Sequence, residues 1–146
     1  MVLEARNIFS ESIRDQNIGV ELKKHYTNFD QQLIAKTTKI VYEHMNEEDF
    51  TVEDLSLAIG LSRMQLHRKL KSLAGFSATE FVNNLKIQYA KKMFDQGCDR
   101  INEVMDAVGM SSYNHFNKVF KKVIGMPPSE YIKNSKKEEK YSNTGS

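Results

Sequence analysis

The chain has 146 residues, 40% of them hydrophobic, which is enough for one domain with a core plus an arm. It contains no apolar run near the ~18 residues of a membrane span, and its acid-bearing N-terminus lacks the apolar segment of a signal peptide. A single cysteine, Cys98, excludes an internal disulfide and favours the reducing cytoplasm, with no membrane contact expected from this fragment. Two prolines and no strand-like alternation predict an all-α fold of about seven helices.

The net charge is only +2, but the charges are unevenly distributed. Residues 1–50 hold 6 Lys and Arg against 9 Asp and Glu, whereas residues 51–146 hold 15 against 10. Two segments, 62–74 and 111–124, carry at least three basic residues each and no acidic one. Basic charge gathered on helices is what attraction to nucleic-acid phosphates requires, although a single such helix is equally well explained as a solvated surface.

Residues 1–30 are predicted to be a linker or arm, with helical character over residues 3–16 and a break at residues 17–19. A helix is expected over residues 31–45, followed by an acidic loop over residues 46–50. The apolar face of that helix consists of Leu33, Ile34, Ile40, Val41 and Met45.

Residues 51–75 are predicted to form a helix-turn-helix. Thr51 and Ser62 are of the residue type that caps a helix N-terminus, and Gly60 between them provides the left-handed conformation of a turn. Gly75 ends the second helix. The positions expected in the core are Val52, Leu55, Ile59, Leu66, Leu70 and Leu73. Their burial would leave the basic face of the second helix in solvent.

A long connector helix is predicted over residues 77–96, opened by a capping box from Ser77 to Glu80. Its buried stripe is expected to consist of Phe81, Leu85, Tyr89, Met93 and Phe94. Such a helix spans roughly 30 Å at about 1.5 Å per residue. This is close to the ~34 Å between successive major-groove faces of DNA, although many helices have this length.

A second helix-turn-helix is predicted over residues 100–125, with its turn at Gly109 and its second helix starting at Ser111. The inward side chains of that helix are Phe116, Val119, Phe120 and Val123. A final helix is expected over residues 127–135, followed by a polar, frayed tail over residues 136–146.

The two predicted units repeat one pattern. Residues 52–81 align with residues 101–131 at an offset of 49, which becomes 50 after one residue inserted beyond the turn. Gly60 thus matches Gly109. Each copy is a short amphipathic helix, a glycine turn, a serine-started basic helix and a second glycine, the pattern of a helix-turn-helix. Two copies predict a protein that contacts two successive grooves of DNA without a dimer.

These units resemble the AraC/XylS family of bacterial transcriptional regulators over residues 33–135. The resemblance rests on the run from Leu55 through Ile59-Gly60-Leu61-Ser62 to Gly75, and on the signature from Ile101 through Gly125-x-x-Pro128-Ser129-Glu130-Tyr131. Three positions depart from the usual family pattern: Met110 replaces a Phe, and Lys86 and Lys118 replace arginines. The substitution at Lys86 puts one contact of the connector in doubt, but none of the three threatens the fold.

The resemblance also implies a context. Residues 50–77 are similar to output domains of hybrid two-component systems and response regulators, and Leu3-Glu4-Ala5-Arg6 resembles the start of the linker that precedes them. It therefore implies a C-terminal fragment with an upstream receiver or sensor domain and RNA polymerase as a partner. A hybrid sensor would anchor the full-length protein in a membrane.

The outward side chains of the two basic helices form the candidate site. Residues expected to read base edges are Arg63, Met64, His67, Arg68, Tyr113, Asn114, Asn117 and Lys118. Residues expected to contact phosphates are Ser62, Lys71, Ser111, Lys121 and Lys122. By the family pattern, the first helix is the better-placed reader. For each of these residues the alternative is an ordinary exposed side chain.

Other chemistry finds little support in the sequence. The four histidines, His25, His44, His67 and His115, fall on separate predicted elements without ligand spacing, so no metal or other cofactor is expected. Cys98 has no evident activating base, and no nucleophile elbow or phosphate loop indicates an enzyme. The competing hypothesis is a helical module that binds an acidic protein through its basic helices.

Overall fold

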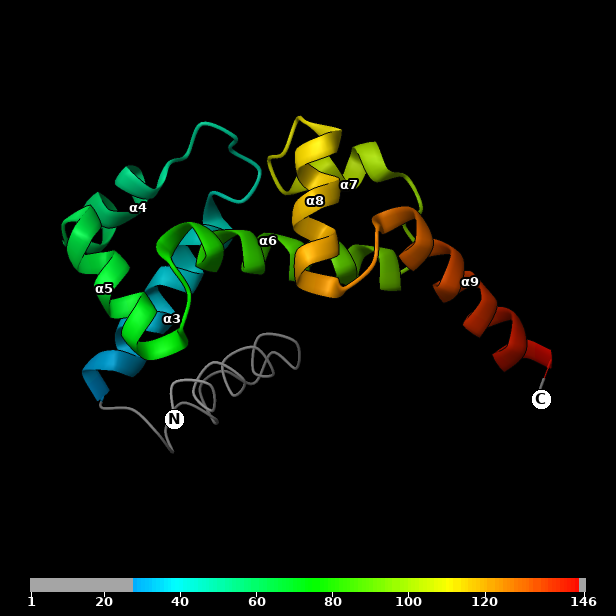
Figure 1. The fold of residues 1–146 in the computed structure, drawn as a ribbon, viewed down its shortest axis with the longest axis horizontal. Coiled ribbons are helices and arrows are strands. Elements are labelled where there is room, and N and C mark those ends of the chain that lie inside the picture. Colours follow the sequence, from blue (N-terminus) through cyan, green and yellow to red (C-terminus); the bar gives the residue numbers. More distant parts are fainter. Residues whose placement is uncertain (1–27, 145–146) are drawn as a thin grey trace. The chain divides into compact units, whose positions relative to one another are not determined.

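The computed structural model describes residues 28–144, with side chains to residue 137, and every regular element in that range is a helix (Figure 1). Seven helices follow one another, as the sequence predicted. They are α3 (Asn28–Glu43), α4 (Val52–Ile59), α5 (Arg63–Ala74), α6 (Ala78–Asp95), α7 (Ile101–Ala107), α8 (Tyr113–Ile124) and α9 (Pro128–Thr144). The described residues divide into two compact units on either side of a boundary inside α6, between Leu85 and Lys86.

The predictions for residues 1–27 lie outside the described residues. The expected boundary of the arm at residue 30 is wrong by three residues, because α3 begins at Asn28. The first turn of α3 contacts a residue that is distant in the chain. Lys69 of α5 lies 5.5 Å from the centre of the Phe29 ring, and its Nζ is 3.9 Å from Asp30 Oδ1. These contacts hold the first turn of α3 against α5.

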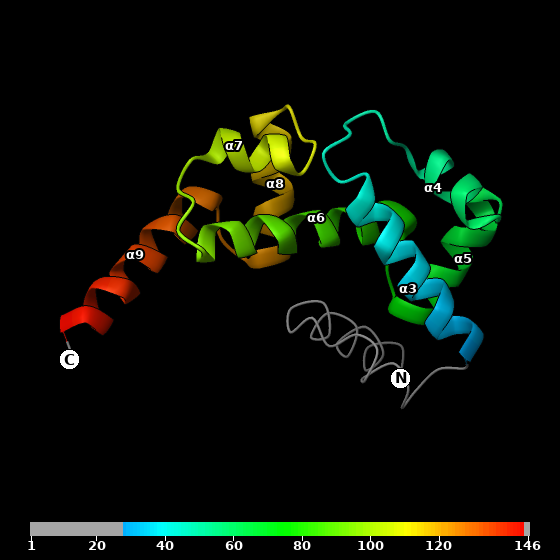
Figure 2. The same cartoon turned by 180° about the vertical axis from the view of Figure 1, so that it is seen from behind.

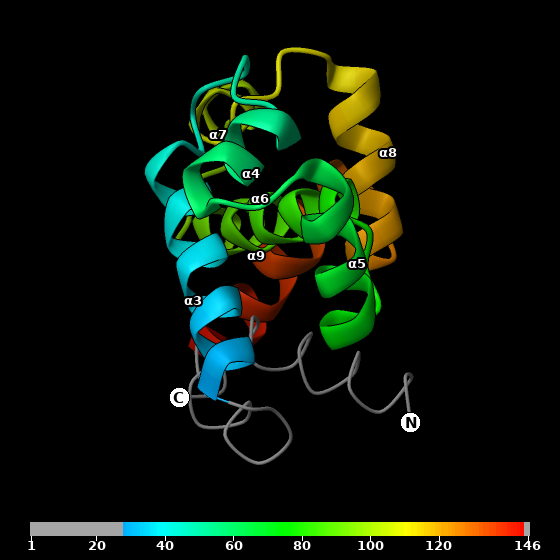
Figure 3. The same ribbon diagram turned by 90° about the vertical axis from the view of Figure 1, so that its left-hand side faces the viewer.

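In the first unit α4 contacts both α3 and α5 (Figure 3). The core includes Ile34, Leu55, Leu66, Leu70, Phe81 and Leu85, each no more than 1% exposed. Three predicted core residues, Ile40, Val52 and Ile59, are only half-buried. Hydroxyl side chains fill inward positions instead: Thr37 and Thr38 are buried and donate to the carbonyls of Leu33 and Ile34 at 2.7 and 2.8 Å. A hydroxyl that bonds back to its own helix can be buried at low cost, a pairing that hydrophobic periodicity does not register.

The caps and the turn of the first helix-turn-helix are as predicted. The Thr51 hydroxyl accepts from the amide of Asp54 at 3.2 Å, and the Asp54 carboxylate accepts from the amide of Thr51 at 2.9 Å. Ser62 forms the same reciprocal pair with Gln65 at 3.1 and 2.9 Å. Gly60 lies between them with φ of +85°, and its amide donates to carbonyls at the end of α4. Local chemistry therefore sets the angle at which α5 leaves α4.

The second unit contains the rest of α6 with α7, α8 and α9, which Figure 2 shows from behind. Its core is aromatic: the ring of Phe120 lies 5.7 Å from Phe94, 5.8 Å from Phe116 and 5.8 Å from Tyr131, measured between centroids. The Tyr131 hydroxyl donates to Asp95 Oδ1, so the same residue joins α9 to the end of α6 through both its ring and its hydroxyl. The turn glycine, Gly109, has φ of +67°, as the repeat predicted.

Two predicted boundaries in the second unit are wrong. The cap of α8 is Ser112 and not Ser111, because the Ser112 hydroxyl accepts from the amide of His115 at 3.2 Å. Ser112 is the residue that aligns with Ser62 once the inserted residue is counted. The final helix does not end near residue 135 but continues to Thr144. Residues 129–144 contain no glycine or proline to stop it, and seven of these sixteen residues are Lys or Glu, which favour a helix.

The inward face of α6 also differs from the prediction. Phe81, Leu85 and Phe94 are buried, but Tyr89 is 37% exposed and Met93 is half-buried. Ile87 and Ala90 are fully buried instead. Apolar residues cover more than one face of this part of α6, so helical periodicity alone did not determine which of them face the core.

The turn at Gly60 provides a test of backbone conformation. A Cβ built there meets nothing within 4 Å, so substitution changes only the backbone energy at φ of +85°. We expect Gly60→Ala to lower the free energy of unfolding by about 1–2 kcal/mol, measured by urea denaturation. Gly60→Asn is the control and should lose less, since asparagine tolerates this conformation. Equal stability of the alanine variant and the wild type would contradict the left-handed turn.

Asp54 makes stability depend on pH in the acid range. Hydrogen bonds from the Thr51 amide and hydroxyl hold the pKa of Asp54 below its ordinary value of 3.8. The group therefore stabilises the folded state above that value, and this contribution is lost as the pH falls through the folded-state pKa. We expect the difference in unfolding free energy between wild type and Asp54→Asn to be constant near neutral pH and to shrink in acid. Subtracting the stability–pH curve of Asp54→Asn from that of the wild type cancels the contributions of the other carboxylates. A difference that stays the same in acid would contradict the capping role of the Asp54 carboxylate.

Candidate nucleic-acid interface

The core contacts of α5 determine which of its side chains reach solvent. Leu66 and Leu70 are completely buried and Leu73 is 7% exposed. The opposite face of this basic helix is exposed, as predicted, and consists of Arg63, Met64, His67, Arg68 and Lys71. Met64 is 62% exposed, so its apolar side chain is presented to solvent on this face.

Two arginines on this face have defined neighbours. Arg68 Nη2 lies 3.2 Å from Met64 Sδ, one helical turn away, so these two predicted base readers form one patch. Arg63 turns toward α4 instead, where its Nη1 donates to Glu53 Oε1 at 2.6 Å. Because both partners of this ion pair are about 60% exposed, it contributes little to stability, but it determines where the guanidinium lies.

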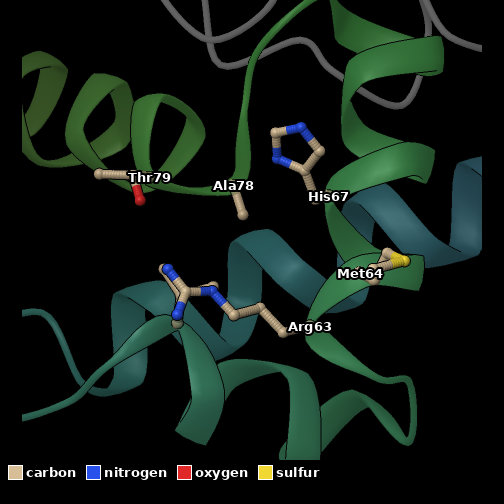
Figure 4. Close-up of a pocket in the computed structure, with 6 residues that line it drawn as sticks. Arg63, Met64, His67, Ala78 and Thr79 are labelled. Atoms are coloured by element: carbon tan, nitrogen blue, oxygen red, sulfur yellow. The ribbon is translucent and has the colours of Figure 1, made fainter.

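A pocket lies beside this patch in the first unit (Figure 4). Its volume is about 390 Å³, and its lining residues are Val52, Arg63, Met64, His67, Ala78 and Thr79. Helical periodicity predicts the exposure of Arg63, Met64 and His67 but not that they line a concave surface with the start of α6. Thr79 was interpreted only as an interior position of a capping box, and no sequence signal brought it into the site.

In the second unit α8 presents a comparable face. Phe116 and Phe120 are fully buried, so Asn114, Lys118, Lys121 and Lys122 are exposed, and Tyr113 is 45% exposed at the start of the helix. No acidic residue interrupts this helix. Ser111 is exposed and lies ahead of α8. The amide of His115, which donates to the cap of this helix, is bonded to the hydroxyl of Ser112 and not to Ser111.

Asn117 is an exception to the predicted exposed face. It is half-buried, and its Oδ1 is enclosed without a hydrogen-bond partner. Its position explains this, because Asn117 lies about 100° around the helix from Phe116 and therefore borders the buried stripe. The prediction that Asn117 projects freely outward is wrong, although its amide lies at the edge of the exposed face.

Other candidate chemistry is sparse in the part of the chain that the structure describes. No three His, Cys, Asp or Glu side chains gather there in a way that could hold a metal ion. His44 bonds to Glu47 and stacks on Phe50 at 4.2 Å between ring centres, in the loop before α4. Within residues 28–144, none of the helices combines the length and apolarity needed to cross a membrane. His25 lies outside the described residues.

A family model described as a helix-turn-helix domain matches residues 55–134, more than half of the chain. The chain belongs to the AraC-type helix-turn-helix family. The match runs from α4 into α9 and so includes both basic helices. AraC-type domains are the DNA-binding parts of transcription regulators, in agreement with the resemblance seen in the sequence.

Three proteins with known names or structures are similar to this chain. A histidine kinase of Formosa agariphila is 31% identical over 72% of this chain, which spans 8% of that protein. The transcriptional regulator MtrA of Neisseria gonorrhoeae is 33% identical over 60% of this chain, which covers 29% of its length. The solved C-terminal domain of AraT, a response regulator from Geobacillus stearothermophilus, matches with a TM-score of 0.63 and 22% identity over 70% of this chain and 84% of its own. The chain thus spans under a third of either curated relative, and the AraT structure shows the shared fold.

Proposed function

We propose that this AraC-type domain binds a specific double-stranded DNA sequence and regulates transcription, with α5 and α8 each entering a major groove. The observation that carries the proposal is the repetition of one arrangement. Each helix follows a left-handed glycine turn, buries one apolar stripe and exposes a basic face that contains no acidic residue. One such helix is explained as a solvated surface, whereas a matched pair in this family supports two readers.

Within each reader the side chains divide by chemistry. Arg68 is suited to guanine O6 and N7, asparagine amides suit adenine, and the exposed apolar groups of Met64 and Tyr113 suit thymine methyls. His67 and Lys118 complete the base-reading set, with Asn114 better placed than the half-buried Asn117. Phosphate contacts are assigned to Ser62, Lys71, Ser111, Lys121 and Lys122. Arg63 stands apart from the base readers because of its contact with Glu53.

We also infer an output role in two-component signalling. A histidine kinase among the relatives and a response regulator among the similar structures support this role. In this reading an upstream receiver or sensor domain controls the fragment, which recruits RNA polymerase in the cytoplasm and performs no catalysis itself. Full-length protein should then change its DNA affinity on phosphorylation of the receiver.

Selection on randomised duplex DNA, followed by anisotropy at several salt concentrations, tests the proposal. A motif in two blocks about ten base pairs apart is expected from two readers in successive major grooves. A mismatch within a block should cost about 1–3 kcal/mol. The alternative function, binding of an acidic protein by the exposed lysines, predicts weak polyanion binding without any base preference.

Arg68→Ala tests base reading by α5. We expect a loss of about 1–3 kcal/mol on the selected duplex and relaxed preference at one base position, because a bidentate contact to guanine is removed. Arg68→Lys is the matched control, which keeps the charge but loses the planar fork, and it should retain non-specific affinity. Unchanged selectivity of the alanine variant, measured by competition with single-mismatch duplexes, would refute the assignment.

Lys121→Ala tests the phosphate assignment in α8. Removal of one phosphate contact should weaken all duplexes by a similar factor and make the slope of log affinity against log salt shallower by about one. Lys39→Ala is the control, since Lys39 lies on α3, is 77% exposed and is paired with Glu43. A loss confined to the selected sequence would contradict a phosphate role for Lys121.

A further inference from the structure

The pocket of the first unit combines two kinds of wall. Val52 and Ala78 contribute apolar surface, while Arg63, His67 and Thr79 contribute polar groups. In Figure 4 the guanidinium of Arg63 and the hydroxyl of Thr79 lie on the same side of the pocket, and the sulfur of Met64 points away from them. A ligand that fits must therefore present an anionic group beside an apolar one.

A DNA strand has this composition, because each anionic phosphate is flanked by the carbon-rich edges of two sugars. A base edge suits the pocket less well, since base edges are planar and are read by side chains that project from a helix. Met64 and Arg68 project in that way on the exposed face of α5. Met64 also lines the pocket, so a strand that borders the groove entered by α5 would pass over it.

Arg63 can take a phosphate without leaving its present position. A guanidinium has five N–H donors in a planar fork, and the structure commits one nitrogen, Nη1, to Glu53. The ion pair is exposed and therefore weak, so a phosphate can share or replace the carboxylate at low cost. An arginine fork matches the geometry of phosphate oxygens better than a lysine does. Glu80, the acid in the first turn of α6, accepts from the amide of Ser77 at 3.2 Å.

We propose that this pocket holds one backbone phosphate of the bound DNA, with the Arg63 guanidinium and the Thr79 hydroxyl as its donors and with Val52 and Ala78 against the adjoining sugar. The proposal rests on the DNA-binding function proposed above. It assigns to Thr79 a role that the sequence did not indicate and moves Arg63 from reading bases to positioning the strand. Because Arg63 and Arg68 sit on one helix, a phosphate fixed at the first sets the depth at which the second reaches a base.

The test uses anisotropy with the selected duplex and an unrelated duplex at several salt concentrations. Arg63→Gln should weaken both duplexes by the same factor and make the salt slope shallower by about one, because one phosphate charge is no longer neutralised. Thr79→Val should weaken both by about tenfold with the slope unchanged, since it removes a donor to a charged group but no charge. Thr79→Ser keeps the hydroxyl and should retain the wild-type affinity.

Duplexes with a single neutral methylphosphonate locate the contact. At one position the neutral linkage should weaken the wild type but add no further loss to Arg63→Gln. The control Lys39→Gln, on α3, should respond to that linkage as the wild type does. Thermal melting of each variant checks that it is folded, and Thr79→Ser provides a second folded comparison.

The outcomes separate this pocket from the function on which it rests. If Arg63→Gln loses affinity for the selected duplex alone and keeps the wild-type salt slope, Arg63 is a base reader. That result would overturn the assignment of the pocket to a phosphate. The assignment would also be overturned if, at every position, the neutral linkage weakened Arg63→Gln by the same factor as it weakens the wild type. A wild type that binds no duplex would overturn both proposals, whereas normal wild-type binding with a silent Arg63→Gln would overturn the pocket alone.

Discussion

The burial of one apolar stripe on each basic helix is the constraint on which the rest of the site depends. Leu66 and Leu70 on α5, and Phe116 and Phe120 on α8, are completely removed from solvent. Each pair fixes the rotation of its helix about the helix axis. Any other rotation would expose these side chains to water, at a free-energy cost of about 1.5–3 kcal/mol per side chain. The basic side chains on the opposite face are therefore held outward without needing interactions of their own.

Rotation alone does not place a helix; its starting point and direction must be fixed too. Reciprocal caps at Thr51 and Ser62, with a left-handed glycine between them, define how α5 leaves α4. In the second unit a left-handed glycine, Gly109, is followed by the cap Ser112. This cap is simpler, because its hydroxyl accepts one hydrogen bond from a backbone amide. Both turns use local hydrogen bonds, so the geometry of each turn, unlike the rotation of the helix that follows it, depends little on contacts between distant residues.

Electrostatics then distinguishes the members of the exposed face. The basic helices contain no acids, so an acidic partner for a site residue must come from a neighbouring element. Glu53 of α4 is such a partner, and it directs Arg63 toward the pocket beside α6. Arg68 remains with Met64 on the projecting face. Two arginines five positions apart on one helix therefore have different surroundings, which supports different roles on DNA.

The sequence by itself determined the all-helical fold, the repeated helix-turn-helix, the glycine turns, the caps at Thr51 and Ser62 and most of the exposed basic face. These features rest on local chemistry: a cap needs a hydroxyl three residues before its amide, and a stripe needs apolar side chains one helical turn apart. The tertiary structure decided what local rules leave open. It determined which apolar residues of α6 face inward, how far Asn117 is enclosed, and how Val52, Arg63 and Thr79 come together from three helices around one pocket. Those outcomes depend on packing between segments distant in the chain, which helical periodicity along a single segment does not encode.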